Sequence, residues 1–477
     1  MRHSVSLSGI EAPRKEARAA LVVVSTLACV TVTVAAAASV EPAIIIGMVL
    51  ATALVVAVAR HPPLAAYILL GATPLIAGID RGAVVPILLP NELLALVLGA
   101  GLVFGSVVRT GRLAFRIPRL TVTERAIVMM AIAGSALPLA WMRLRGVTIT
   151  SDDLQYALLI WKFLGVYAIV RASIRTPRDV GICLRITLVA GCVVACIAIL
   201  QALQLFGVPR LLSTYFAPYG NVRAVSLNRG GATLGLPIAV ADLMVFEIAI
   251  AVGLIVRNIG RRALLVLAAL LLAFAAIAAG EISGIIALLI GAIALAVITR
   301  RASIVAWGLP VAAVAVVALG TVVERRLAGF DGASGIPVGW VGRVHNLTGY
   351  FWPELFSGGR FILGVRSAAR VPAPDQATGF VWIESGYTWL LWSGGIVFLL
   401  TFIWFVSVTI RWTVRLARHR MDEVGVAALV VTVALVVIAA LMVVDPHLTY
   451  RGSADLFFST AALASIRNVH REATWST

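Results

Sequence analysis

The sequence is poor in charged residues. Only 13% of its 477 residues are Asp, Glu, Lys or Arg, whereas about 25% is usual for soluble domains. Hydrophobic residues make up 61% of the chain, and they gather in runs of about 20, the length that crosses the apolar core of a bilayer. The scarcity of charge excludes an ordinary soluble protein and predicts an all-α polytopic membrane protein.

Acidic residues are especially scarce. The chain has 39 Lys and Arg residues against 22 Asp and Glu, which gives a net charge of +17. Such a balance can indicate nucleic-acid binding, but the arginines here stand in short segments between apolar runs, as membrane topology requires. No basic segment belongs to a soluble domain that could display it. We therefore expect no nucleic-acid partner.

Cysteines and the common catalytic motifs are also few. The four cysteines, Cys29, Cys183, Cys192 and Cys196, fall within apolar runs, where small buried hydrophobes are expected rather than a disulfide or a metal site. The sequence has no Walker loop, zinc-ligand cluster or GxSxG elbow, so we expect neither a metal nor a cofactor. It also shows no internal repeat, whereas many transporters are built from such repeats.

The apolar runs predict about fourteen transmembrane helices. They cover residues 19–40, 42–59, 62–79, 88–108, 126–142, 153–170, 179–203, 234–256, 262–280, 283–299, 302–321, 387–410, 424–444 and 453–466. The second, third and last runs are short or carry Pro, Gly or polar residues. The chain thus divides into helices 1–11 (residues 1–321), a long polar loop (322–386) and helices 12–14 (387–477).

The basic residues predict the orientation of these helices. With both termini in the cytoplasm, nearly twice as many Lys and Arg residues fall in cytoplasmic segments as in external ones. Cytoplasmic loops carry such an excess in membrane proteins. We therefore expect both termini inside the cell and the 322–386 loop outside.

The external loop has features of a short amphipathic helix. Val344, Leu347, Phe351 and Leu355 recur at helical spacing, a pattern that can lie along the membrane interface. In a helix, Arg343 and His345 point about 200° apart, so only one of them can face a reaction centre. Five of the eleven tryptophans fall between residues 340 and 392, and either an interfacial belt or sugar stacking explains them.

Some charged residues stand in unusual places. The 207–233 segment carries Arg210, Arg223 and Arg229 without an acidic residue, which fits either an anionic ligand or contact with lipid phosphates. Lys162 and Glu247 fall deep within spans, where a functional site and a structural ion pair are both plausible. Near the outer side, Asp242 and Glu92 could line a cavity or bond to neighbouring helices.

Several of these residues together form a recognisable pattern. Gly342-Arg343 is followed by an aromatic pair, by Leu363-Gly364-Val365, and by Glu384 just before a helix that begins Gly-Tyr and continues to Gly-Gly-Ile. Upstream, Arg223-Ala-Val-Ser-Leu-Asn-Arg-Gly-Gly-Ala precedes a span, and Leu-Pro-Asn-Glu opens an early one. This layout resembles the O-antigen ligase and polymerase superfamily of bacterial envelope glycosyltransferases.

The resemblance implies a function in the bacterial cytoplasmic membrane. A glycan carried on a polyprenyl diphosphate would be transferred to an acceptor sugar hydroxyl at the outer face, with inversion and without a metal or cofactor. The partners would be this donor, a glycan or glycolipid acceptor, membrane lipids and, if one exists, an envelope assembly complex. Whether the product is a polymer or a capped lipid stays open.

The resemblance also implies roles for individual residues. Arg223 and Arg343 match the diphosphate-binding arginines, with Arg229, Arg360 or Arg366 as support, because guanidinium groups bind phosphates well. Glu384 matches the general base, with His345 second, although a carboxylate favoured by the start of a helix also explains Glu384. For the acceptor or sugar, the expected contacts are Trp352, Trp382, Tyr387 and His447.

One departure from the family pattern concerns a Ser-Arg at the outer end of a middle span. This chain has Ala279-Gly280-Glu281-Ile282-Ser283-Gly284 there, so the arginine is missing. Arg229 or an arginine of the external loop could replace it. The alternatives to a glycosyltransferase are a polytopic transporter or lipid-linked glycan flippase, and a non-catalytic scaffold.

Overall fold

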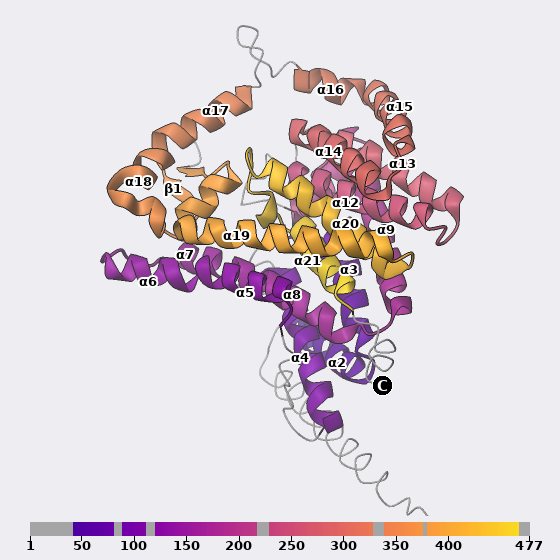
Figure 1. Cartoon of the computed structure of the whole chain (residues 1–477), viewed down its shortest axis with the longest axis horizontal. Helices are drawn as coiled ribbons and strands as arrows, with labels where there is room; N and C mark the ends of the chain where they lie inside the picture. The colour runs from indigo at the N-terminus through magenta and orange to yellow at the C-terminus, as the bar shows by residue number, and fades with distance from the viewer. Residues whose placement is uncertain are drawn as a thin grey trace, which may run out of the picture.

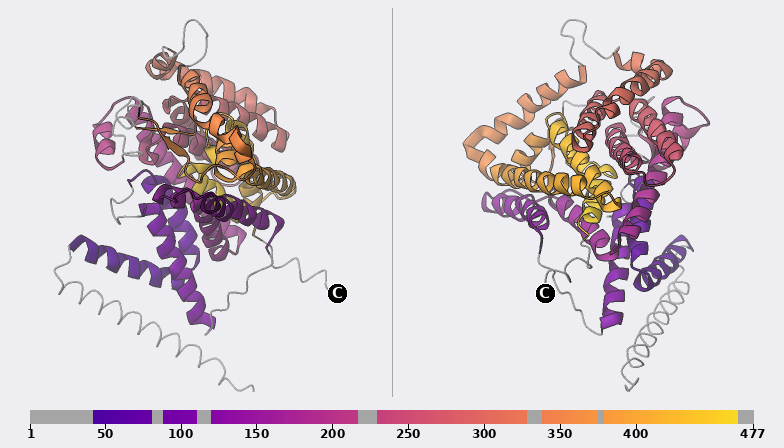
Figure 2. Two further views of the ribbon diagram at one scale, coloured as in Figure 1. Left: turned by 90° about the vertical axis from the view of Figure 1, so that its left-hand side faces the viewer. Right: turned by 45° about the vertical axis from the view of Figure 1, so that its right-hand side comes forward.

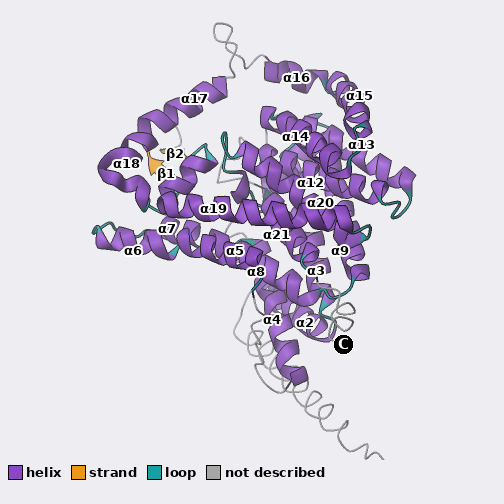
Figure 3. Cartoon of the chain, in the orientation of Figure 1, coloured by secondary structure: helices purple, strands orange, loops and turns teal. Residues whose placement is uncertain are grey.

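The computed structural model is helical almost throughout, with one pair of short strands (Figure 3). It describes residues 42–80, 88–110, 120–216, 229–327, 338–374 and 379–466. The first half comprises α2 (Pro42–Arg60), α3 (Pro63–Ile76), α4 (Pro90–Thr110), α5 (Val122–Ala133), α6 (Ala136–Leu144), α7 (Ser151–Ala157), α8 (Leu159–Ser173), α9 (Pro177–Ala202), α10 (Val208–Tyr215), η2 (Ala232–Leu234) and α12 (Pro237–Val256).

The second half contains the remaining helices and both strands. They are α13 (Arg262–Ala278), α14 (Ile282–Thr299), α15 (Ser303–Ala318), α16 (Gly320–Leu327), α17 (Val338–Asn346), η3 (Leu347–Phe351), α18 (Trp352–Phe356), η4 (Ser357–Ile362), β1 (Arg370–Pro372), β2 (Phe380–Trp382), α19 (Gly386–His419), α20 (Glu423–Leu441), η5 (His447–Thr449) and α21 (Ser453–Ala464). The strands pair antiparallel, with Val371 opposite Val381.

The all-α membrane class is confirmed. Each predicted span from the second onward coincides with an apolar helix or with two consecutive ones. Among the described residues, eight such helical segments are long and apolar enough to cross a membrane, and five are shorter. The first predicted span, 19–40, lies outside the described residues. The total of fourteen spans and their orientation therefore remain predictions.

Helices α12 and α20 form the centre of the bundle (Figure 1). Both are apolar on every side rather than along one stripe, which is the pattern of a helix surrounded by others. Small residues allow close packing. A Cβ on Gly253 of α12 would lie 2.9 Å from a methyl group of Val426 on α20. Because this core holds both helices, it also fixes the turns at their ends.

Three membrane-length helical segments, Val122–Leu144, Ser151–Ser173 and Gly386–His419, are each interrupted, and the interruptions lie close together. Between α5 and α6 the chain breaks at Gly134–Ser135, and α19 kinks at Gly395, whose φ is +65°. The breaks touch: a Cβ on Gly394 would lie 2.4 Å from the carbonyl oxygen of Ala133. Trp161, near the junction of α7 and α8, donates a hydrogen bond of 2.9 Å to the Ser135 hydroxyl. Glycine makes this backbone geometry possible.

The external loop expected from the sequence folds back over the start of α19. In Figures 1 and 2, α17 and α18 form an arch above α19, with α6 and α7 on its other side. The amphipathic prediction holds for Leu347, Phe351 and Leu355, which are buried. Val344 is 57% exposed. The π-helical turn η3 contains Leu347 and Phe351 and changes the helical register between Val344 and Leu355.

Candidate functional site

Arg343, Glu384 and Asp445 meet although they come from three distant parts of the chain. Arg343 lies in α17, Glu384 in the turn before α19, and Asp445 in the turn after α20. The Nη1 atom of Arg343 lies 2.7 Å from Oδ2 of Asp445, and its Nε atom lies 3.8 Å from Oε1 of Glu384. Asn346, one helical turn after Arg343, donates a 3.3 Å hydrogen bond to Oε2 of Glu384.

The backbone between α19 and α20 brings the two carboxylates together. The amide groups of Gly386 and Tyr387 both donate to the carbonyl oxygen of Met442, at 2.7 and 3.2 Å. The packing at Gly386 is close, because a Cβ there would lie 2.2 Å from the sulfur of Met442 and 3.1 Å from the carbonyl oxygen of Asp445, so the Met442 side chain would have to shift. The N-cap of α19 is Ser385, whose hydroxyl accepts from the Thr388 amide. Glu384 thus precedes the cap, and its carboxylate turns toward α17.

Burial makes these carboxylates easier to protonate than usual. Burial raises the pKa of Glu384, and the Arg343 charge and the Asn346 hydrogen bond only partly oppose this. Burial also raises the pKa of Asp445 to about 6, against the opposing charges of Arg343 and His447. The Glu384 side chain is still 35% exposed, so a substrate can reach it. A carboxylate with a raised pKa beside a guanidinium can accept a proton near neutral pH.

His447 lies behind this group and is paired with Asp242 of α12. Its Nδ1 atom lies 2.7 Å from Oδ2 of Asp242, and each residue is 1% exposed. The sequence suggested that His447 contacts the acceptor. The structure does not place it for that role, because its ring is enclosed by protein and reaches no surface. Of the two roles considered for Asp242, the structure supports the bond to a neighbouring element.

The other arginines expected at the diphosphate have partners elsewhere. Arg229 pairs with Glu281 at 3.1 Å, so the glutamate that stands where the family has Ser-Arg is neutralised by the arginine expected to replace it. Arg360 pairs with exposed Glu354. Arg366 forms a two-point ion pair with Asp153. Arg223 lies outside the described residues.

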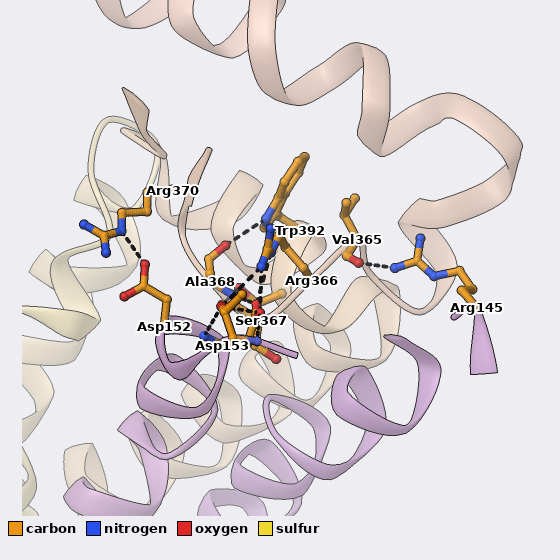
Figure 4. Close-up of polar contacts among 11 residues, drawn as sticks. Arg145, Asp152, Asp153, Val365, Arg366, Ser367, Ala368, Arg370 and Trp392 are labelled. Carbon is orange, nitrogen blue, oxygen red and sulfur yellow. Dashed lines mark hydrogen bonds and ion pairs between the residues drawn. The ribbon is translucent and has the colours of Figure 1, made fainter. Parts of the chain in front are cut away.

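Arg366 belongs to an anchor that fastens the segment between α18 and α19 to α7 (Figure 4). Asp153 is fully buried, and it accepts from Arg366 at 2.6 and 3.1 Å and from the Ala368 amide at 3.0 Å. Its carboxylate also caps α7 through Thr150. Asp153 therefore both caps α7 and ties two distant segments together.

Two further contacts belong to this anchor, one on each side of the Arg366–Asp153 pair (Figure 4). Arg370 of β1 is ion-paired with Asp152, and its guanidinium lies 4.6 Å from the centre of the Phe380 ring. Arg145 donates to the carbonyl group of Val365. The arginines at 366 and 370 thus have structural roles that their sequence positions do not reveal.

The remaining predicted residues divide into two groups. Trp352 of α18 contacts the start of α19, where its indole donates to the Thr388 hydroxyl at 3.3 Å, and Tyr387 lies at the start of α19, where its hydroxyl donates to the carbonyl group of Ala439. Trp382 lies in β2 and is half-buried. His345 is exposed, whereas Arg343 two residues earlier faces Glu384, as helical geometry requires.

The charges deep in the spans are paired differently from the expectation. Lys162 and Glu247 do not form an ion pair with each other. The ammonium group of Lys162 lies 3.8 Å from Asp455 and 3.9 Å from Glu92, while Glu247 accepts a hydrogen bond of 3.0 Å from Thr187. Asp455 also accepts from the Asn91 amide at 3.4 Å. Sequence distance hid these partners, which lie up to 364 residues apart.

Within the described residues, no cluster of three or more His, Cys, Asp or Glu side chains could hold a metal ion. The geometry instead provides one arginine between two carboxylates, with an amide beside them and a buried His–Asp pair behind. Comparison with known proteins found no matching family model, no matching curated protein and no matching solved structure.

Proposed function

We propose that this protein is a membrane glycosyltransferase of the polysaccharide polymerase or ligase type. It transfers a glycan from a polyprenyl diphosphate to an acceptor sugar hydroxyl at the outer face of the bacterial cytoplasmic membrane. One observation carries the proposal: Arg343 and Glu384, a phosphate-binding group and a base, lie 3.8 Å apart. The reaction requires an orientation with fourteen spans and both termini in the cytoplasm. The distribution of basic residues predicts this orientation.

In this reaction Glu384 accepts the proton of the acceptor hydroxyl. The acceptor oxygen forms a bond to the anomeric carbon as the bond from that carbon to the diphosphate oxygen breaks, so the configuration inverts. Arg343 stabilises the charge that develops on the departing polyprenyl diphosphate. The raised pKa of Glu384 suits a base that works near neutral pH.

The unequal contacts of Arg343 support an exchange of partners. Asp445 lies 2.7 Å from the guanidinium, whereas Glu384 lies 3.8 Å from it. A diphosphate can therefore replace Glu384 beside Arg343 without breaking the closer pair. This would free Glu384 for the acceptor, and loss of the neighbouring positive charge would raise the pKa of Glu384 further, making it a stronger base.

The charge of the group needs one further step before an anion binds. Two ionised carboxylates beside one guanidinium leave an excess negative charge, which repels a diphosphate. Asp445, whose pKa is raised to about 6, can take up a proton as the anion approaches, which removes that excess, and its neutral carboxyl group still accepts a hydrogen bond from Arg343. Arg223 would add positive charge from the neighbouring segment, and Arg229, which Glu281 already neutralises, would add less.

The proposal is tested by following lipid-linked saccharides in cells. Removing the protein should cause such a saccharide to accumulate, and Arg343→Ala and Glu384→Gln should fail to reverse the accumulation although both variants insert in the membrane. Arg411→Ala is the matched control, because Arg411 lies on α19 far from Glu384, is exposed and donates only to the Ser407 carbonyl group in the described contacts. Full complementation by both site variants would disprove the proposal. Accumulation of single repeat units would indicate a polymerase, and of long chains a ligase.

A transporter or flippase is the second candidate, and one observation favours it. Lys162 and Glu92 of two membrane-length helices form a charged group with Asp455 of the shorter apolar helix α21, and such groups often lie on transport pathways. Movement of a labelled polyprenyl-diphosphate saccharide across vesicles, lost in Lys162→Met and retained in Glu384→Gln, would favour this candidate over the glycosyltransferase.

A further inference from the structure

The Asp242–His447 pair has no role in the reaction proposed above, yet it is the most enclosed polar contact next to the site. The residues are 205 positions apart, each is 1% exposed, and their atoms approach to 2.7 Å. A carboxylate can only accept, so the imidazole donates from Nδ1. Taking both groups out of water has a cost, which indicates that the contact serves a purpose.

His447 and Asp445 belong to the same short turn. The His447 amide donates to the carbonyl oxygen of Asp445 at 2.8 Å, and Pro446 between them restricts the backbone. The two side chains leave this turn in different directions. His447 reaches α12 through Asp242, and Asp445 reaches α17 through Arg343. A movement of His447 must therefore move Asp445.

The orientation of Arg343 depends on this turn in two ways. Its Nη1 atom contacts the Asp445 carboxylate at 2.7 Å and donates to the carbonyl oxygen of Val444 at 3.4 Å. Both contacts engage the same nitrogen, so the planar guanidinium keeps other donors for a second partner. A guanidinium binds phosphate well only when its donors face the oxygens.

We propose that Asp242 and His447 are positioning residues for the donor: they fasten the 442–447 turn to α12, so that Asp445 holds the Arg343 guanidinium facing the diphosphate. The inference rests on the proposed function and adds to it a connection between the bundle core and the diphosphate site. Neither residue touches substrate. Their effect is transmitted through Asp445 to Arg343.

The experiment measures the affinity of the purified full-length protein in detergent for geranyl diphosphate, by titration calorimetry. His447→Leu and Asp242→Leu each remove the contact and should weaken binding about tenfold, the size of one lost hydrogen bond to a charged group. The double variant should bind no more weakly than either single one, because both changes act through one contact. His447→Asn, which keeps an N–H near the Nδ1 position, should bind within about threefold of the parent.

Folding is checked for every variant by size-exclusion chromatography and circular dichroism. If a single variant does not fold, the double variant decides, since replacing a whole buried pair with apolar residues is often tolerated. A merely structural pair would lower the thermal midpoint and leave the affinity unchanged, and that result would overturn the proposal. Arg343→Ala separates the positioning proposal from the proposed function. If this variant binds the diphosphate like the parent, the diphosphate role of Arg343 is wrong, and the positioning role falls with it.

Discussion

Arg366 and Asp153, 213 residues apart, form a two-point ion pair at 2.6 and 3.1 Å that fastens the segment between α18 and α19 to the start of α7. The carboxylate is fully buried, and its remaining contacts are the Ala368 amide and Thr150. This anchor holds the chain between α18 and α19 and therefore limits how far α17 can move from Glu384. Its strength bears on the stability of the whole site.

Breaking the anchor should loosen the segment between α18 and α19. Arg366→Ala leaves Asp153 buried without its cation, which costs about 3 kcal/mol when one partner of a buried pair is removed. We expect a lower thermal midpoint and faster proteolysis between residues 357 and 385. Arg360→Ala is the control, since its partner Glu354 is exposed and surface pairs contribute at most about 1 kcal/mol. Equal proteolysis of both variants would show that the anchor is not decisive.

The rate of transfer should rise with pH as Glu384 loses its proton. Because burial raises the pKa of Glu384, the rising limb of the pH–rate profile should lie above the usual range of a glutamic acid. The Asn346 hydrogen bond opposes that shift, so Asn346→Ala should move the limb to higher pH. Glu384→Gln should abolish the limb together with activity. A limb that Asn346→Ala leaves in place would assign it to another group.

The pKa of Asp445 predicts a pH dependence of stability. In the folded protein its pKa is raised to about 6 from 3.8, so the folded state binds a proton more tightly than the unfolded one. The stability that this proton provides is present below about pH 4 and is lost as the pH rises to about 6, by roughly 3 kcal/mol. Thermal unfolding in detergent between pH 4 and 7 measures the loss, and Asp445→Asn should reduce it. An unchanged profile in that variant would contradict this assignment.

Lys162 should stabilise the bundle by neutralising two carboxylates. Lys162→Met leaves Asp455 and Glu92 facing each other without a cation, and we expect a loss of roughly 3 kcal/mol in the free energy of unfolding. Adding Asp455→Asn to this variant should restore part of the loss, because one of the uncompensated charges is gone. Chemical unfolding in mixed micelles compares the three proteins. No recovery in the double variant would mean that Lys162 acts through another contact.

The orientation of the chain can be tested with single cysteines in a cysteine-free background. Thr348→Cys, on the exposed face near the end of α17, should react with an impermeant maleimide in intact cells. Arg415→Cys, near the end of α19 and exposed, should react only after permeabilisation. The opposite pattern would place the proposed site in the cytoplasm and exclude a donor at the outer face.

The sequence alone determined the class of the protein, because runs of apolar residues are a local property. Every span predicted within the described residues corresponds to an apolar helix, and Leu347, Phe351 and Leu355 are buried as their spacing indicated. The π-helical turn at Leu347–Phe351 was not predicted, because no local pattern announces it. The sequence identified Arg343 and Glu384 as candidate site residues, but it did not predict that they lie close together.

Only the tertiary structure decided which charges meet. Arg366 and Arg229 resemble Arg343 in sequence, since each is an isolated arginine between apolar runs, yet each meets one carboxylate, Asp153 or Glu281, whereas Arg343 meets both Asp445 and Glu384. Asp445 and His447 stand two residues apart, but one faces Arg343 and the other Asp242. Ion pairs form between residues that packing brings together, and packing joins segments whose separation along the chain is arbitrary. No local pattern can therefore report which carboxylates an arginine meets.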